Sequence, residues 1–456
     1  MARLNKKKKT GYTYEGSKAA HISPESRLRR SVMACMLWED EFYEDGMTIA
    51  DRIVSLVGKA DPFHVANMTS AARNQMKLRH VPLLMTREMA RLPEHKKYVA
   101  DTLADIIQRP DELAEFLAIY WKNKREPLGA QVKKGLARAF TKFDAYQLSK
   151  YNRKSSVKLK DVLFLCHAKP RDKEQEAVWK QLIDGTLKPP DTWEVGLSSG
   201  KSKKAVWERL LAKKKLGAMA VLRNLRNFQE AGVKEKLVID ALKTMKSSKV
   251  LPFRFIAAAR YAPCLEKHIE KAMLNCLDRK KKLTGHTVLL IDVSGSMEES
   301  VSRKSEMSRL DAAAGIAIMA REICKKVDVF TFSEHLVRVP ARRGFALRDA
   351  IVNSQPHVCT YLGGAVRNIY GLKKDAGKNN RHSGKPYNLR PDRLIVFTDE
   401  QSHDPVPDPA GRAFMVNVAS AKNGVGYGSW FHIDGWSEAV IDYIREVEGE
   451  RLPCVR

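Results

Sequence analysis

The stretch that decides the fold is an apolar run followed by spaced hydroxyls: residues 288–297 read VLLIDVSGSM. Four consecutive aliphatic residues predict a strand buried on both faces, as in a parallel sheet covered by helices. The run ends in the spacing Asp-x-Ser-x-Ser, which brings Asp292, Ser294 and Ser296 to the carboxyl end of the strand. Open α/β sheets bind ligands at this end. The stretch therefore predicts an α/β domain with a site of oxygen ligands.

Helices and strands alternate along the chain around this run. A second apolar strand ends in Asp399, and Thr360 precedes an expected helix. We expect strands at 286–293, 327–333, 393–398 and 413–418, and helices at 309–326, 345–353, 362–370 and 437–447. This alternation is typical of a doubly wound sheet, which we assign to residues 284–456.

These polar residues offer hard oxygen atoms, most of them uncharged. Such a set suits Mg²⁺, which prefers octahedral oxygen coordination and keeps part of its water shell. The pattern resembles the metal-ion-dependent adhesion site of von Willebrand A domains. The resemblance implies that Mg²⁺ or another divalent cation is ligated by Asp292, Ser294, Ser296 and Thr360, with Asp399 in support, directly or through water. The simpler interpretation is that Asp292 and Ser294 cap a helix after the strand.

Catalysis has less support in the sequence. An open position on a metal ion also activates water in hydrolases. No His or Lys accompanies the metal residues in a fixed pattern that would supply a base, and we expect His403 in a solvent loop. Residues 196–202 resemble a phosphate-binding loop, but three residues separate the glycines where the motif needs four. We therefore expect no enzyme; a metal-dependent hydrolase is the least supported alternative.

The chain before this domain is predicted to be helical. Apolar residues recur at spacings of three and four from residue 24 to residue 279, with breaks at Pro62, Pro110 and 189–190. Stacked helical hairpins are typical of an α-solenoid, although no strict sequence period is present. We predict a helical-repeat domain over 23–283, with a generic all-α domain as the alternative. Residues 1–22 are expected to form a flexible basic arm.

Positive charge is concentrated in the helical part. The 456 residues carry a formal net charge of +28, and 58 of the 81 Lys and Arg precede Thr287, against 32 of the 53 Asp and Glu. One-sided positive charge suits a polyanion such as RNA, because each neutralised phosphate releases counterions. A basic surface that only aids solubility is the simpler alternative.

One segment shows how this charge is arranged. On a helix over 130–151, apolar residues form one stripe, while Lys134, Arg138 and Lys142 recur every four residues elsewhere on the helix. Aligned cations repel one another unless a counter-charge arrives. We therefore expect these three residues to contact RNA; a solvated helix face is the alternative.

A helical-repeat domain followed by a von Willebrand A domain resembles the TROVE family, which includes the Ro ribonucleoprotein autoantigen and its bacterial and phage relatives. The resemblance covers nearly the whole chain. Besides the metal motif, it is carried by the segments KDVLFLCHAKP (160–170), TWE (192–194), AVLRNL (220–225) and LPFRF (251–255). The chain departs from the family at Glu400, where relatives often have Asn, and this leaves the ligand surface beside the ion in doubt.

The resemblance implies a ring of HEAT-like repeats joined to the von Willebrand A domain. It also implies binding of small structured Y-like RNA on an outer basic surface and of single-stranded ends of misfolded noncoding RNA in a central hole. In bacteria the family is linked to RNA quality control, often with an exoribonuclease partner. Carried over to this chain, RNA contacts are expected at His167 and Lys169. A packing role for His167 and a structural salt bridge for Arg223 are the alternatives.

The cysteines and the hydropathy bear on the compartment. Seven cysteines without a CxxC pair indicate free thiols in a reducing environment. No apolar run approaches the roughly 18 to 20 residues of a spanning helix, and no signal peptide is evident. We expect a soluble, cytoplasmic protein without a membrane partner. The alternative function from another class is a metal-dependent protein-interaction scaffold with no specific RNA.

Overall fold

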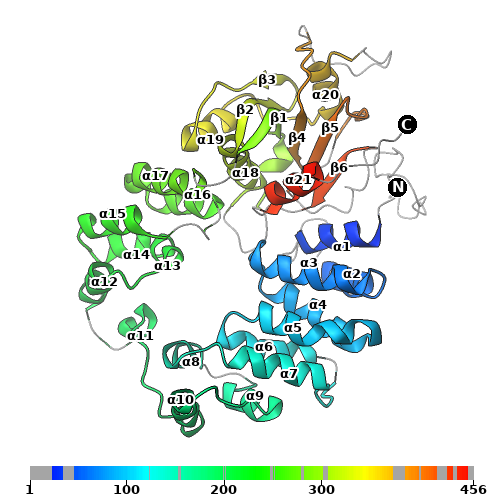
Figure 1. Ribbon diagram of the computed structural model, residues 1–456. Helices are drawn as coiled ribbons and strands as arrows, with labels where there is room; N and C mark the ends of the chain where they lie inside the picture. The colour runs from blue at the N-terminus through cyan, green and yellow to red at the C-terminus, as the bar shows by residue number, and fades with distance from the viewer. Residues whose placement is uncertain are drawn as a thin grey trace, which may run out of the picture. The chain divides into compact units, whose positions relative to one another are not determined.

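The computed structural model of the protein is coloured along the chain in Figure 1. The described residues form two compact units, one from Ser23–Leu37 and Met47–Lys215 and the other mainly from Leu216–Arg456. The predicted basic arm, 1–22, lies outside the described residues. The structure describes residues 23–33, 46–122, 124–152, 156–198, 200, 202–246, 250, 252–278, 282–300, 307–372, 386–399, 402–418, 429–434 and 439–449.

The first unit consists of helices and their connections over its described residues. Neighbouring helices pack in succession: α3 against α4 and α5, α5 against α7, and α7 against α9. This arrangement confirms the helical prediction for the region. The elements are α1 (Pro24–Met33), α2 (Gly46–Val57), α3 (Pro62–Asn74), α4 (His80–Arg91), η1 (Pro93–His95), α5 (Lys96–Ile106), α6 (Pro110–Tyr120), α7 (Ala130–Phe140), α8 (Ala145–Tyr151), α9 (Leu159–Cys166), α10 (Lys173–Asp184), α11 (Trp193–Ser198) and α12 (Lys203–Ala212).

The core of this unit is formed by the apolar faces of α1 to α10. Phe116, Leu136 and Phe140 are fully buried within it. A close helix contact lies at Gly135 of α7, where an added Cβ would be 2.7 Å from the Cβ of Leu103 on α5. Glycine at this position lets the two helix backbones approach closely.

A buried ion pair joins three helix ends. Glu112, in the first turn of α6, is fully buried, and its Oε1 accepts a hydrogen bond from Nη2 of Arg73 on α3 at 2.6 Å. Its Oε2 accepts the backbone N–H groups of Gln108 at 2.8 Å and Arg109 at 3.1 Å. Arg73 also donates to the carbonyl of Ile106, the last residue of α5, at 2.8 Å. One carboxylate thus fixes α3, α5 and α6 relative to one another.

Residues 130–151 form two helices, so the prediction of one helix was wrong. α7 ends at Phe140 and α8 begins at Ala145. The side chain of Asp144 accepts the backbone N–H of Gln147 at 2.7 Å, and the side chain of Gln147 accepts the backbone N–H of Asp144 at 3.1 Å. This capping box starts a new helix and leaves Lys142 in the turn between α7 and α8.

The second unit begins with helices and continues into a sheet. The strand order is β3-β2-β1-β4-β5-β6, and every neighbouring pair is parallel except β2 with β3. The elements are α13 (Ala218–Arg223), α14 (Leu225–Glu230), α15 (Glu235–Thr244), α16 (Pro252–Tyr261), η2 (Pro263–Leu265), α17 (Glu266–Leu277), β1 (Leu283–Asp292), η3 (Gly295–Glu298), α18 (Arg309–Ile323), β2 (Cys324–Phe332), β3 (Leu336–Arg338), α19 (Gly344–Val352), α20 (Leu362–Tyr370), β4 (Arg393–Thr398), β5 (Arg412–Asn417), β6 (Phe431–Asp434) and α21 (Ala439–Gly449).

The sheet confirms the predicted doubly wound domain. β1 and β4 are its two central strands, and Val288, Leu289, Leu290 and Ile291 of β1 are fully buried. Because the strand is buried on both faces, polar and apolar residues do not alternate along this run. Two short strands, β3 and β6, were not predicted. The predicted helix over 309–326 was too long, because residues 324–326 already belong to β2.

Helices that precede the sheet pack against the helices of the sheet domain. α16 and α17 contact α18, and α17 also contacts α19. Arg260 of α16 forms a 2.7 Å ion pair with Asp311 of α18. Glu270 of α17 accepts the backbone N–H of Phe345, in the first turn of α19, at 2.7 Å. The change from helices to sheet near residue 283 therefore lies inside one compact unit.

A buried arginine links the sheet to α21. Arg393, the first residue of β4, is 4% exposed and donates to the hydroxyl of Thr287 on β1 at 2.7 Å. It also donates to the carbonyl of Thr284 at 2.7 Å and forms an ion pair with Glu448 of α21 at 2.5 Å. These contacts hold the amino ends of two central strands to a helix that is distant in sequence.

Candidate metal site and basic surface

The predicted metal residues begin at the carboxyl end of β1. Asp292 is the last residue of that strand and is fully buried. Its Oδ1 accepts the backbone N–H of Ser294 at 2.9 Å, and its Oδ2 accepts the hydroxyl of Thr398 at 2.6 Å. Burial, and after it the negative charge of Asp399, raise the pKa of Asp292 to about 7. Two carboxyl groups therefore share a site from which water is largely excluded, and a cation would relieve their repulsion.

The hydroxyl residues lie around Asp292. The Oγ atoms of Ser294 and Ser296 are 3.3 Å apart. An added Cβ on Gly295 would lie 3.4 Å from the carbonyl oxygen of His357, so the segment leading to Thr360 passes over this turn. Thr360 is 3% exposed, and its backbone N–H donates to Nδ1 of His403 at 3.1 Å. Both loops of the predicted site thus meet at the edge of the sheet.

An arginine that the sequence analysis did not identify also belongs to this site. Arg309, the first residue of α18, is fully buried, and its Nη1 donates to Oδ2 of Asp399 at 2.7 Å. The same nitrogen donates to the carbonyl of Ser296 at 3.1 Å, and Nη2 pairs with Glu299 at 2.7 Å. Arg309 therefore connects the turn after β1 to the carboxylate after β4. No linear motif indicated this role, because its acceptors lie on two segments that are about 100 residues apart, residues 296–299 and Asp399.

The donor set fits a hard divalent cation. Oδ1 of Asp399 is buried and accepts no hydrogen bond from the described residues. A buried carboxylate oxygen without a donor is costly unless a cation compensates it. Within the described ranges no group of three or more His, Cys, Asp and Glu is placed to hold an ion. The candidate site instead combines two carboxylates with hydroxyls, the chemistry that suits Mg²⁺ better than zinc.

The loop that follows Asp399 is anchored to α20. Asp404 accepts the backbone N–H groups of Gly363 at 2.8 Å and Gly364 at 2.6 Å, in the first turn of that helix. Arg367 forms a 2.8 Å ion pair with the same carboxylate. His403 beside it is exposed, as expected for a solvent loop. The described part of this loop, from Ser402 onward, is thus held against the helix that follows Thr360.

The three side chains predicted to contact RNA in the region of α7 differ in the interactions that they already make within the protein. Lys134 is exposed, and no interaction of its side chain occurs within the described residues. Arg138 pairs with Asp101 of α5. Lys142 donates to the carbonyl of Ile107 at 2.8 Å, and its pKa is lowered by burial. The expected row of three cations on one helix is therefore wrong, since only Lys134 and Arg138 share α7.

The residues at the end of α9 are more accessible. His167 follows the helix in the left-handed conformation, with φ of +53°, and is exposed, as is Lys169. Exposure excludes the alternative in which His167 is a buried packing residue. Phe164, in the last turn of α9, is 58% exposed, and the sequence analysis did not select it. An exposed aromatic ring near two polar, basic side chains is a chemistry that suits an unpaired nucleotide.

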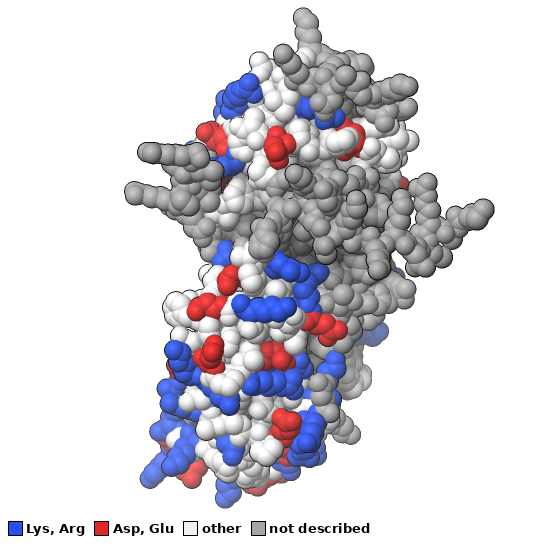
Figure 2. Space-filling view, turned by 90° about the vertical axis from the view of Figure 1, so that its right-hand side faces the viewer, with Lys and Arg blue, Asp and Glu red and all other residues white. Residues whose placement is uncertain are grey.

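Charge over the helical unit is mixed and not uniformly basic. Figure 2 shows Lys and Arg side chains on the visible face of this unit, with Asp and Glu interspersed among them. Arg223, on α13 in the other unit, is exposed and forms no ion pair with described residues. The salt-bridge alternative for Arg223 is therefore wrong for the described part of the chain.

None of the described helices combines the length and the apolar character needed to cross a membrane.

Comparisons with known proteins agree with this architecture. The TROVE domain family model matches residues 30–186 and 184–329. Telomerase protein component 1 of Rattus norvegicus is 25% identical over 45% of this chain, and the Mus musculus protein is 42% identical over 16%. The chain spans only 11% and 3% of the length of these relatives. The crystal structure of the Deinococcus radiodurans RO (RSR) protein matches with a TM-score of 0.64 and 19% identity, covering 91% of this chain and 97% of that one.

Proposed function

Because the chain belongs to the TROVE domain family, we propose that it is the RNA-binding protein of a Ro-type ribonucleoprotein. The RNA would be a small structured noncoding, Y-like RNA, together with single-stranded ends of misfolded RNA, and the role would be RNA quality control. The observation that carries this proposal is the exposed surface at the end of α9, where Phe164, His167 and Lys169 are accessible. Its similarity to telomerase protein component 1 and to the Deinococcus radiodurans RO (RSR) protein is in line with this proposal.

The two kinds of side chain on this surface have different physical roles. Lys169, and Lys134 on the neighbouring α7, would neutralise phosphates without reading the sequence. Phe164 would stack on an unpaired base, which duplex RNA does not offer because its bases are already stacked. The surface therefore suits a single-stranded end or loop next to a structured region.

Replacement of Phe164 by Ala should weaken binding of a single-stranded RNA oligonucleotide and leave binding of an RNA duplex unchanged. One lost stacking contact costs about 1–3 kcal/mol. Fluorescence anisotropy with labelled single-stranded and duplex RNA of equal length would measure both affinities. Phe63 of α3 provides the matched control, since its ring is 59% exposed, against 58% for Phe164.

The control decides how the result is interpreted. F63A should bind both RNAs as the wild-type protein does. If F63A and F164A lose the same affinity, the loss reflects a general effect of removing surface aromatic rings, and the site at α9 is wrong. Equal losses for single-stranded and duplex RNA in F164A would contradict stacking.

Charge reversal tests the phosphate contacts separately. The double variant K134E/K169E should bind single-stranded RNA on the order of tenfold more weakly or worse. The slope of log affinity against log salt should fall by about 1.4, because each lost phosphate contact contributes roughly 0.7 for a single strand. Lys236→Glu with Lys243→Glu, on exposed positions of α15, produces the same net charge change elsewhere. An identical loss in this second variant would show that total charge, and not the α9 surface, controls binding.

The metal site is proposed to hold Mg²⁺ through Asp292, Ser294, Ser296 and Thr360, with Asp399 nearby. A bound ion would supply a positive centre with a free coordination position for an anionic oxygen of a partner. His403 lies beside Thr360, but its Nδ1 accepts the backbone N–H of that residue, so we propose a binding role and no catalysis. An exoribonuclease is the kind of partner that the family resemblance implies.

A second candidate function is a metal-dependent protein-interaction scaffold without specific RNA. The observation that favours it is the buried Oδ1 of Asp399, which accepts no hydrogen bond from the described residues and would be compensated by a cation whether or not RNA is bound. Crosslinking and sequencing of RNA copurified with the chain distinguishes the two. A small structured RNA that is lost in K134E/K169E supports the ribonucleoprotein, whereas magnesium-dependent recovery of protein partners without RNA supports the scaffold.

A further inference from the structure

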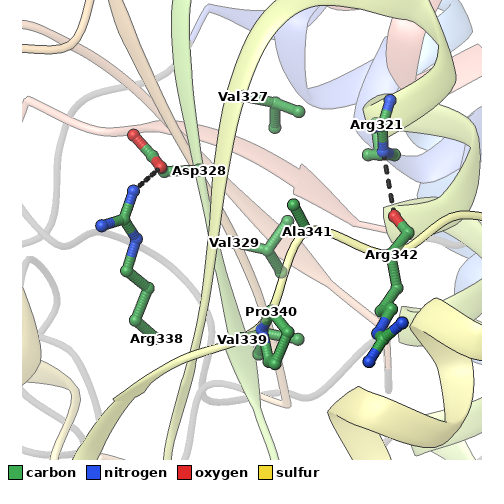
Figure 3. A pocket seen from close by; sticks show the side chains of 9 residues that line it. All are labelled: Arg321, Val327, Asp328, Val329, Arg338, Val339, Pro340, Ala341 and Arg342. Carbon is green, nitrogen blue, oxygen red and sulfur yellow. Dashed lines mark hydrogen bonds and ion pairs between the residues drawn. The ribbon is translucent and has the colours of Figure 1, made fainter.

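A pocket at the side of the sheet is not used by the proposed function. It lies between β2, the segment that follows β3, and the last part of α18 (Figure 3). Its volume is about 330 Å³. The lining belongs to the amino-terminal half of β2, from Val327 to Val329, whereas the metal site is at the carboxyl ends of the parallel strands. The pocket is therefore separate from the metal site.

Three arginines line the pocket. In Figure 3 Arg338 lies on one side of the valines, and Arg321 and Arg342 lie on the other. Nε of Arg321 donates to the backbone carbonyl of Arg342 at 3.0 Å, which holds the two residues next to each other. The guanidinium of Arg342 is exposed and has no interaction with any described residue. A guanidinium with all its donors available is well suited to a forked contact with an anion.

The acidic residue in the pocket does not cancel this charge. Both carboxylate oxygens of Asp328 are engaged, one with Arg338 at 2.5 Å and the other with His286 at 2.8 Å. Burial alone would raise the pKa of Asp328, but the hydrogen bonds from Arg338 and His286 outweigh it and lower the pKa. Asp328 is thus ionised and paired. Nη1 of Arg321 lies 3.8 Å from the carboxylate of Glu322, so Arg342 carries the positive charge of the pocket that no described carboxylate compensates.

The rest of the lining is apolar. Val329 and Val339 are 7% and 5% exposed and form a floor, and Pro340 and Ala341 complete the wall. Small-molecule pockets measure roughly 300–1,000 Å³, so this one admits a single group of nucleotide size and not a folded chain. A ligand that matches both the apolar lining and the positive charge has a flat apolar body and a compact anionic group. We infer that the pocket binds a nucleoside monophosphate group, with its phosphate at Arg342 and its base against the valines.

Two sources supply this chemistry: a free mononucleotide and the 5′-phosphorylated end of an RNA chain. An acidic peptide is a different class, and the pocket suits it less. The acidic side chains of such a peptide are flexible and aliphatic, so no flat group would pack against the apolar floor of the pocket. The pocket is a different site from the proposed RNA surface at α9, because none of the residues that line it belongs to the unit that contains α9.

Isothermal titration of the full chain with AMP tests the inference, with adenosine as the probe that lacks the phosphate. The wild-type protein should bind AMP at least tenfold more tightly than adenosine. Arg342→Ala should weaken AMP binding on the order of 10- to 100-fold, because a charge-assisted contact is lost while no intramolecular contact is broken. Arg412→Ala is the matched control, since Arg412 is an exposed arginine in the same unit without a partner in the described residues.

A second variant tests the cavity without changing the charge. Ala341→Trp places a large ring at the exposed wall of the pocket, and it should abolish AMP binding while the circular dichroism spectrum is unchanged. The two sources are distinguished with a short 5′-phosphorylated RNA and its 5′-hydroxyl counterpart. Preference for the phosphorylated RNA over AMP assigns the site to an RNA end, and the reverse preference assigns it to a free nucleotide.

Three results would overturn the inference. The first is AMP binding that is unmeasurable at millimolar concentration together with no discrimination between the two RNAs. The second is an equal effect of Arg342→Ala and Arg412→Ala. The third is displacement of bound AMP by a glutamate-rich peptide at equal concentration, which would assign the pocket to acidic peptides. Each result is independent of the α9 surface, so failure here leaves the proposed function standing.

Discussion

The Glu112→Ala variant should lose about 3–5 kcal/mol of unfolding free energy, which is the usual cost of removing one partner from a buried ion pair. The substitution leaves the guanidinium of Arg73 in the core without its counter-charge, although its hydrogen bond to Ile106 persists. It also leaves the backbone N–H groups of Gln108 and Arg109 without their acceptor at the start of α6. Urea denaturation followed by circular dichroism would measure the loss.

The matched control is Asp101→Ala. Asp101 also pairs with an arginine on another helix, Arg138, but the two side chains are 79% and 50% exposed. Exposed pairs contribute about 0–1 kcal/mol, so this variant should differ little from the wild-type protein. Glu112→Gln should be intermediate, because the amide oxygen still accepts a backbone hydrogen bond while the charge is lost. Similar stabilities for E112A and D101A would contradict the assignment of Glu112 as a buried junction.

Asp292→Asn should have opposite effects in the absence and the presence of magnesium. Without the ion, the variant should be more stable than the wild-type protein by on the order of 2–4 kcal/mol at pH 8. The reason is that the folded pKa of Asp292 is about 7, well above the usual value of an aspartate in the unfolded chain. The ionised form is therefore penalised only in the folded state. The Asn oxygen can accept the Ser294 N–H, and its amide group can face Thr398.

The pH dependence has a defined sign. The penalty on the wild-type protein is absent below about pH 4, grows as the pH rises toward 7 and is complete above 7, so the advantage of D292N should shrink on acidification. With Mg²⁺ at a hundredfold excess over its Kd, the wild-type protein should gain about 2.7 kcal/mol and D292N nothing. Thermal unfolding in EDTA and in magnesium, at pH 5 and pH 8, would measure both. A magnesium response that survives in D292N would rule out the site as drawn.

The sequence could place the candidate metal residues at one end of the sheet, because they follow strands that local sequence specifies. The run from Val288 to Ile291 is buried on both faces, so its composition alone marks an inner strand and places Asp292 at its end. Asp399 was predicted in the same way from the strand before it. Parallel strands that are neighbours bring their carboxyl ends together, which is why two segments 106 residues apart could be assigned to one site.

The remaining features depend on contacts that a linear pattern does not record. In the sequence Arg309 is only the first residue of a predicted helix. Its ion pair with Asp399 depends on β4, which brings Asp399 beside it in the folded protein. β3 and β6 are three and four residues long, too short for a periodicity. The helix break before Asp144 did have a signal in the sequence, because Asp144 and Gln147 have the spacing of a capping box. The regular spacing of Lys134, Arg138 and Lys142 suggested one continuous helix instead. Phe164 was overlooked because an aromatic residue in a helix is usually interpreted as core.

The contacts of Arg393 make two central strands depend on the last described helix. Arg393 and its carboxylate partner, Glu448, lie 55 residues apart in the sequence. Loss of α21 would remove the counter-charge of an arginine that also donates to Thr287 and Thr284 of β1. The amino ends of β1 and β4 are therefore expected to open together with α21, and not independently of it, in amide hydrogen exchange.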